Sequence, residues 1–184
     1  VFPERLRGAG NEGERPAAFC HEVLQAVCDL VPAVKIQAAC FEALGPGGMQ
    51  AMAGVIRQAT ELGLVAILDG KRNDIGSTAE AYAKAYLGRD GRSAWGADAL
   101  TVNPYLGSDS LDPFLRVANE QGAGVFVLVK TSNPGGGMFQ DLEALGKPLY
   151  RHVAAYVEAQ AAATASACGY GSLGAVVGAT YPAQ

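Results

Sequence analysis

Long apolar runs and dense charge are both missing from this 184-residue sequence, and each absence excludes a class of protein. No stretch approaches the roughly 20 apolar residues that span a bilayer, and residues 1–16 lack the apolar core of a secretory signal. We therefore expect a cytoplasmic protein with no membrane partner. Only 17% of the residues are charged, the net charge is −4 and no basic run occurs, so nucleic acid is not an expected partner.

Motifs for metals and nucleotide cofactors are also missing. The four cysteines form no CxxC pair and lie in apolar or alanine-rich surroundings, which favours free thiols over metal ligands or disulfides. The two histidines have no partner at metal-ligand spacing. No GxxxxGK[ST] motif occurs, and the glycine-rich stretches GPGG and NPGGG lack the GxGxxG spacing. The sequence therefore predicts neither a bound metal nor a nucleotide cofactor.

Five short apolar segments rich in β-branched residues are each typical of a buried strand. These segments are residues 33–36, 64–68, 99–102, 124–129 and 173–177. The stretches between them have helical patterns, and several end at a glycine that can cap a helix. This alternation predicts an α/β protein with a parallel sheet, either open and doubly wound or closed into a barrel. In both forms ligands bind at the carboxyl ends of the strands.

Polar residues gather at those predicted strand ends. They are Lys35 in the first segment, Asp69 and Lys71 after the second, Asn103 after the third, the stretch KTSNP after the fourth and GAT after the fifth. The densest group is DGKRNDIGST, residues 69–78, which follows the apolar run LVAIL. If the strand continues through Lys71, alternation puts Asp69 and Lys71 on the same side, where Lys35 can lie beside them. Burying such charges is costly unless they pair with each other or with a ligand.

Asp74 has a purely structural alternative. It lies just before a helix that we expect to begin near Ser77 or Thr78, so Asp74 or Ser77 can act only as an N-cap. An N-cap role accounts for Asp74, but it does not account for an inward-facing Asp-x-Lys pair at the end of an apolar strand.

The stretch LDGKRNDIGST resembles the Asp-x-Lys-x-x-Asp-Ile-x-x-Thr signature of the orotidine 5'-phosphate decarboxylase family. The stretches VKIQAACFEALG, ADALTVNPYLG, VFVLVKTSNPG and GAVVGAT resemble the bacterial type 2 subgroup in the same order, over about residues 30–182. The resemblance implies a (β/α)8 TIM barrel of the ribulose-phosphate-binding type. It also implies a carboxy-lyase that decarboxylates orotidine 5'-phosphate to UMP without a cofactor, and a homodimer with shared active sites.

The resemblance also implies a role for individual residues. Lys35, Asp69 and Lys71 match the charged catalytic array of the family, with Lys71 as the proton donor to the pyrimidine ring. Asp74 matches a carboxylate that acts in the partner subunit's site. The residues implied to contact substrate are Ile75, Thr78 and Ser132.

The chain departs from the family pattern in length. A barrel of this kind has eight strand–helix units and about 250 residues, whereas five strands are predicted here. We expect residues 1–184 to form a single partial barrel domain holding strands two to six, with the first strand and the last two absent. Two alternatives stay open: a related sugar-phosphate decarboxylase or aldolase, typically with Mg²⁺, and a non-catalytic barrel remnant.

Overall fold

The computed structural model describes residues 14–180, which divide into two compact units. The first unit contains the chain up to Gly70 together with residues 84–100. The second contains residues 71–83 and the chain from Thr101 onward. The opening stretch VFPERL, on which the expected absence of a first strand rests, lies outside the described residues.

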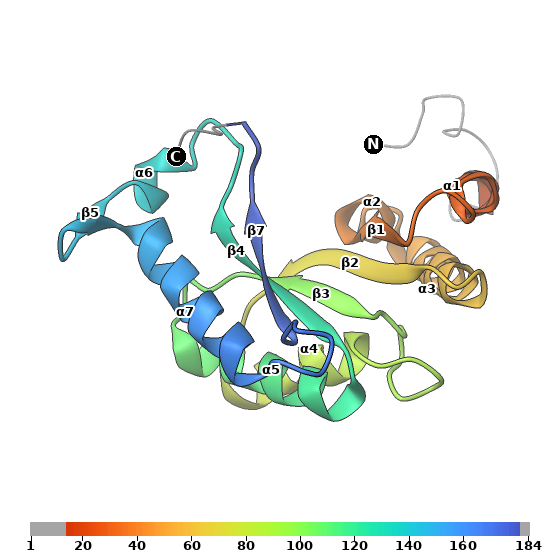
Figure 1. Cartoon of the computed structure of the whole chain (residues 1–184). Helices are drawn as coiled ribbons and strands as arrows, with labels where there is room; N and C mark the ends of the chain where they lie inside the picture. The colour runs from red at the N-terminus through yellow and green to blue at the C-terminus, as the bar shows by residue number, and fades with distance from the viewer. Residues whose placement is uncertain (1–13, 181–184) are drawn as a thin grey trace. The chain divides into compact units, whose positions relative to one another are not determined.

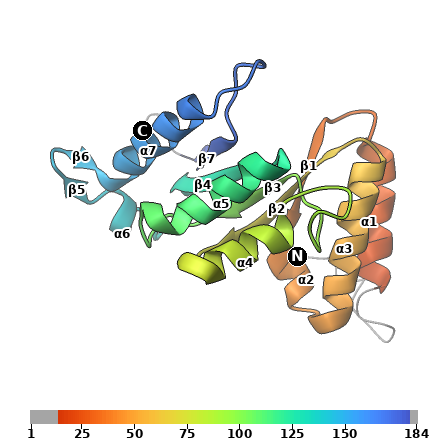
Figure 2. The same cartoon turned by 90° about the horizontal axis from the view of Figure 1, so that it is seen from below.

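The first unit packs helices against a pair of parallel strands. Its elements are α1 (Glu14–Val27), β1 (Ala33–Gln37), α2 (Ala38–Glu42), α3 (Gly45–Glu61) and most of β2 (Val65–Arg72). Strands β1 and β2 run in register from Ala33 beside Val65 to Gln37 beside Asp69. Helices α1 and α3 lie side by side (Figure 2).

Helix α3 shows how the sequence builds the core of this unit. Met52, Val55, Ile56 and Ala59 recur at the spacing of one helical face, and each is at most 2% exposed. Leu24 of α1 and the β2 side chains Ala66 and Leu68 are buried in the same unit. The buried core therefore lies on the amino-terminal part of β2, just before its charged end.

The second unit contains the remaining elements. They are most of α4 (Gly76–Tyr86), α5 (Ser108–Gln121), β4 (Gly124–Lys130), α6 (Gly137–Gln140), β5 (Glu143–Ala144), β6 (Lys147–Pro148), α7 (Leu149–Ala163) and β7 (Leu173–Val177). Strands β4 and β7 are parallel, with a register irregularity between Leu128 and Lys130. Helices α4 and α5 lie side by side (Figure 2), and an ion pair of 2.9 Å joins Arg116 to Glu80.

The parallel strands follow the order β1-β2-β3-β4-β7, where β3 is Ala99–Val102 (Figure 1). Strands β2 and β3 both run through the division between the two units, so each unit contains part of the pair. All four β3 residues are buried, as expected for a central strand. The five predicted strands are confirmed, and β1 and β7 end the strand order.

The second apolar segment extends further than predicted. Strand β2 continues through Asp69 and Lys71 to Arg72, so the first charged residues of DGKRND belong to the strand itself. Among residues 14–180, no helix combines the length and the apolar character needed to span a membrane.

Candidate active site

Lys35, in the middle of β1, and Asp69, in the carboxyl half of β2, form an ion pair. The Lys35 Nζ atom lies 2.6 Å from Asp69 Oδ2. The Asp69 residue is 7% exposed, whereas the Lys35 side chain is 53% exposed. Gln37, two residues further along β1, donates from Nε2 to the backbone oxygen of Asp69 at 3.3 Å. The ion pair with Lys35 offsets part of the cost of burying the Asp69 carboxylate.

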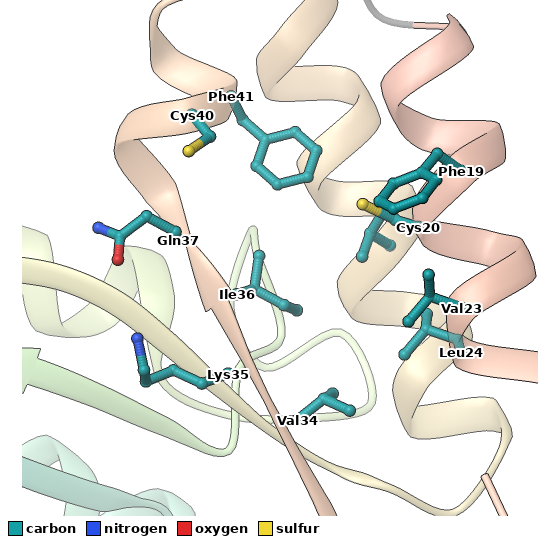
Figure 3. Close-up of a pocket in the computed structure, with 11 residues that line it drawn as sticks. Phe19, Cys20, Val23, Leu24, Val34, Lys35, Ile36, Gln37, Cys40 and Phe41 are labelled. Atoms are coloured by element: carbon teal, nitrogen blue, oxygen red, sulfur yellow. The ribbon is translucent and has the colours of Figure 1, made fainter. Parts of the chain in front are cut away.

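The alternation of β1 separates this pair from an apolar pocket. Figure 3 shows Lys35 and Gln37 projecting to one side of β1 and Ile36 to the other. The pocket has a volume of about 360 Å³ and is lined mostly by apolar side chains of α1, α2, α3 and β1. Lys35 is the charged residue on its border. The polar chemistry of the first unit is therefore on the Lys35 side of the strand.

Lys71 adopts an unusual backbone conformation for a residue in a strand. Its φ is 46°, which is in the left-handed region that L-residues rarely occupy. Its backbone N–H donates to the Thr101 hydroxyl of β3 at 2.9 Å, and its side chain is exposed. One residue later, the Arg72 carbonyl accepts a hydrogen bond from the N–H of Asn103 at 2.9 Å. This left-handed residue means that strand alternation alone cannot give the direction of the Lys71 side chain.

The residues that follow Lys71 lead into α4. Asp74 Oδ1 accepts a hydrogen bond from the N–H of Ile75 at 2.8 Å, just before the helix begins at Gly76. This contact is compatible with a helix-entry role. Ile75 is 55% exposed, and Thr78, three residues further on, is exposed as well. Both side chains are therefore accessible at the beginning of α4.

Ser132 lies in the loop between β4 and α6, with an exposed side chain. The two residues that precede Ser132 are tied to the end of α6. Gln140 accepts a hydrogen bond from the Thr131 N–H, and Asp141 contacts the buried ammonium of Lys130. The loop that carries Ser132 is thus fixed at its β4 end.

The structure brings some of the predicted residues together within each unit. In the first unit it pairs Lys35 with Asp69. In the second unit it places Lys71 against Thr101, and Asp74 and Ile75 at the beginning of α4. Ser132 stands in a separate loop of that second unit.

Sequence reasoning missed the side chains that support the predicted site residues. Thr101 supports the backbone of Lys71, and Gln37 contacts the backbone of Asp69. A hydroxyl inside the apolar segment ALTV was an available signal for Thr101. Gln140 and Asp141 were missed because they come eight and nine residues after Ser132, and nothing in the sequence indicates that the chain turns back there.

No cluster of three or more His, Cys, Asp or Glu side chains that could hold a metal ion occurs between residues 14 and 180.

Comparisons with known proteins place the chain in a family. The family model described as orotidine 5'-phosphate decarboxylase / HUMPS family matches residues 16–184. A Rhodopirellula baltica protein named orotidine 5'-phosphate decarboxylase is 55% identical over 191 residues, covering 100% of this chain and 63% of that protein.

Two solved structures have the same fold. A crystal structure from Streptomyces avermitilis has a TM-score of 0.84 at 39% identity and covers 96% of this chain and 60% of its own. The structure of Leishmania donovani OMP decarboxylase has a TM-score of 0.77 at 34% identity and covers 96% and 65% of the two chains. The chain thus spans less than two thirds of the length of these relatives.

Parallel strands alternating with helices define an α/β protein. The likeness to the solved decarboxylase structures identifies it as part of an α/β barrel. Within that class, the chain belongs to the orotidine 5'-phosphate decarboxylase / HUMPS family. The resemblance inferred from DGKRNDIGST is confirmed, and so is the predicted fold class of a (β/α)8 barrel that is present in part.

Proposed function

We propose that this chain forms part of an orotidine 5'-phosphate decarboxylase, a carboxy-lyase that converts orotidine 5'-phosphate to UMP and CO2 without a cofactor. The observation that carries the proposal is the Lys35–Asp69 ion pair between β1 and β2, followed two residues later by Lys71. The names of its relatives support the same reaction.

The reaction needs a cation beside one ring carbon. When the bond from C6 of the pyrimidine to the carboxylate breaks, its electron pair stays on C6 and CO2 leaves. No adjacent carbonyl can absorb this charge as a simple enolate, so a fixed positive charge is the appropriate device. We assign that role to Lys71, whose ammonium then delivers a proton to C6 and is reprotonated from solvent.

Asp69 and Lys35 complete the proposed charge array. Asp69 is held in place by the ammonium of Lys35 at 2.6 Å, and an ionised Asp69 repels the substrate carboxylate before CO2 is lost. At ~4 Å and an effective dielectric constant near 20, such repulsion is worth about 4 kcal/mol. Enzymatic accelerations can require ~20 kcal/mol, so most of the effect must come from stabilising the carbanion and from binding the rest of the substrate.

Substrate contacts and a partner subunit complete the proposal. Ser132 contacts the pyrimidine ring, and Asp74, Ile75 and Thr78 act in the active site of a second copy of the chain. Ile75 is 55% exposed, so its side chain is accessible to a second copy of the chain. We place this reaction in the synthesis of UMP, and we propose the cytoplasm as its compartment.

The test uses an extended chain, in which residues 1–184 are joined to the parts of the Rhodopirellula baltica relative that lie outside the matched region. We expect this extended chain to convert orotidine 5'-phosphate to equal amounts of UMP and CO2, unaffected by a chelator. Turnover only of a ribulose-type sugar phosphate in the presence of Mg²⁺ would favour the alternative decarboxylase or aldolase. Absence of both activities in a folded protein would favour the non-catalytic remnant.

The shared site has its own test, based on subunit exchange. The Asp74→Asn and Lys71→Ala variants of the extended chain are each expected to be inactive. After mixing, one of the two sites in each heterodimer carries both native residues, so activity should return. If confirmed subunit exchange restores nothing, Asp74 is a helix-entry residue, as its contact with the Ile75 N–H allows.

A further inference from the structure

The side-chain amide of Gln140 makes two hydrogen bonds to Thr131, in the loop that follows β4. Gln140 Oε1 accepts from the Thr131 N–H at 2.9 Å, and Gln140 Nε2 donates to Thr131 Oγ1 at 2.7 Å. The Thr131 hydroxyl in turn donates to Asn133 Oδ1 at 2.6 Å. Because a backbone N–H can only donate, this pattern also fixes which end of the Gln140 amide faces it. Both neighbours of Ser132 are thereby restrained.

The next residue along the chain reinforces this connection. Asp141 contacts the Nζ atom of Lys130, the last residue of β4. Lys130 is 5% exposed, and its ammonium lies 5.0 Å from the centre of the Tyr150 ring. Separating Asp141 from Lys130 would leave a buried ammonium unpaired at a high cost in free energy, so the ion pair is favoured. Residues 140 and 141 together hold residues 130 and 131.

The backbone of Gly178 packs closely against Ser132. Its N–H donates to the Lys130 carbonyl at 2.7 Å, immediately after β7. A Cβ atom at Gly178 would lie 2.9 Å from both the backbone nitrogen and the Cβ atom of Ser132. Such contacts are closer than packed atoms allow, so only glycine permits this approach. Ser132 is consequently restrained from the β7 side as well.

The Ser132 hydroxyl is left available by this arrangement. Thr131 and Asn133 direct polar groups at each other, and Gln140 directs its own at Thr131. The hydroxyl of Ser132, by contrast, makes no hydrogen bond to any residue in the described part of the chain, and the side chain is exposed. Thr131, Asn133 and Gln140 thus hydrogen-bond to one another and hold the loop, while the Ser132 hydroxyl can bond to a ligand.

We propose that Gln140 is a positioning residue that holds Thr131 and thereby places the Ser132 hydroxyl against the pyrimidine ring of the substrate. This inference rests on the function proposed above. A hydroxyl can donate to a ring carbonyl or accept from a ring N–H only within about 2.5–3.0 Å. If the loop were mobile before substrate binds, ordering it would cost free energy and weaken substrate binding. Gln140 therefore acts on substrate through Ser132, without touching the substrate itself.

A double-mutant cycle in the extended chain tests the inference. Ser132→Ala should raise KM for orotidine 5'-phosphate about tenfold, the scale of one lost hydrogen bond in a binding site. Gln140→Leu should raise KM by a similar factor and change kcat less, because a ground-state contact is lost. In the Ser132→Ala background, Gln140→Leu should add less than a further twofold. Gln50→Leu, on the exposed side of α3, serves as the matched control and should leave KM unchanged.

Two further readouts separate positioning from a general loss of structure. Gln140→Glu keeps an acceptor for the Thr131 N–H and should recover most of the lost affinity. Hydrogen exchange at the Thr131 amide should accelerate in Gln140→Leu and stay slow in Gln50→Leu. Additive effects of Gln140→Leu and Ser132→Ala, or unchanged Thr131 exchange, would overturn the inference while leaving the decarboxylase proposal intact. An extended chain without turnover would overturn the proposed function, and this inference with it.

Discussion

Lys71 holds a backbone conformation that the residue type does not favour. A left-handed conformation, here with φ at 46°, costs an L-residue about 1–2 kcal/mol but costs glycine almost nothing. Strain of this kind persists where surrounding contacts impose it, and functional sites are common examples. The hydrogen bond from the Lys71 N–H to Thr101 is one such contact.

The strain at Lys71 predicts that a glycine at this position is more stable than an alanine, the reverse of the usual order. In the extended chain, Lys71→Gly should be more stable than Lys71→Ala by about 1 kcal/mol, because only glycine relieves the left-handed strain. Both variants lack the ammonium group, so electrostatic effects cancel in the comparison. Urea unfolding gives the two free energies. A Lys71→Ala variant as stable as Lys71→Gly would show that the backbone at this residue is not strained.

Two thiols should differ in reactivity because their surroundings shift their pKa values in opposite directions. A hydrogen bond with Ser166, at 2.9 Å, lowers the pKa of the exposed Cys168 thiol, whereas burial raises the pKa of the Cys20 thiol. The thiolate is the nucleophile, so alkylation of Cys168 should rise with pH at a lower pH than alkylation of Cys20. Ser166→Ala should shift the pH dependence of Cys168 alkylation to higher pH, because the hydrogen bond that lowers the pKa is lost. Peptide mass mapping after iodoacetamide treatment measures both rates, and coincident profiles would contradict the assignment.

At the scale of elements, one ion pair joins the amino ends of β2 and β3. Asp98 accepts hydrogen bonds from the Arg89 guanidinium and from the Ala66 N–H, the latter at 2.7 Å. Arg89 also donates to the Leu64 carbonyl at 3.0 Å. These groups lie at the strand ends opposite to Asp69. In barrels of this class the amino ends contribute stability and the carboxyl ends catalysis.

Removal of the Asp98 carboxylate should therefore separate stability from activity. In the extended chain, Asp98→Ala should lower the free energy of unfolding by about 2 kcal/mol, because the Ala66 N–H loses its acceptor. The kcat of this variant, measured at a temperature at which it is still folded, should stay within twofold of the native value. Asp29→Ala, at an exposed position after α1, is the matched control and should change neither quantity. A large fall in kcat without a loss of stability would place Asp98 in the active site.

The sequence predicts the strands better than their ends and better than the short elements. Runs such as LVAIL are apolar throughout, so burial identifies them without knowledge of their neighbours. The sequence left open whether β2 continues through Lys71 to Arg72, because charged residues after an apolar run also suit a turn. Helix α6 and the β5–β6 hairpin, whose strands are two residues each, are too short for a periodic pattern.

The candidate site is predicted in part for a similar reason. Asp69 and Lys35 are charged residues at the predicted strand ends, and their contact follows from the parallel pairing of β1 with β2. The left-handed backbone of Lys71 has no sequence signal, since glycine is the usual residue there. The Gln140–Thr131 contact depends on the path of the loop between them, which local patterns do not determine.

At the scale of the whole molecule, the parallel strand order of residues 14–180 has two edge strands. Strands β1 and β7 end the sheet order within the described residues, and Val177 of β7 is 65% exposed. Such edges promote association with other chains. Light scattering should show more aggregation for the 184-residue chain than for the extended chain, together with much lower UMP formation. Equal solubility and comparable activity would contradict the expectation that further strands complete the barrel.

In the proposed reaction, Lys71 stabilises the carbanion at C6 and supplies its proton. In the extended chain, Lys71→Ala should lose essentially all UMP formation while still binding UMP, because a contact made only in the transition state is removed. Lys147→Ala, which removes an exposed lysine of β6, should be as active as the native chain.

The measurement is the rate of CO2 release from carboxyl-labelled orotidine 5'-phosphate at saturating substrate, for the native extended chain and for these two variants. We predict release at the native rate from Lys147→Ala and none above background from Lys71→Ala. Release from Lys71→Ala at more than a tenth of the native rate would contradict this prediction.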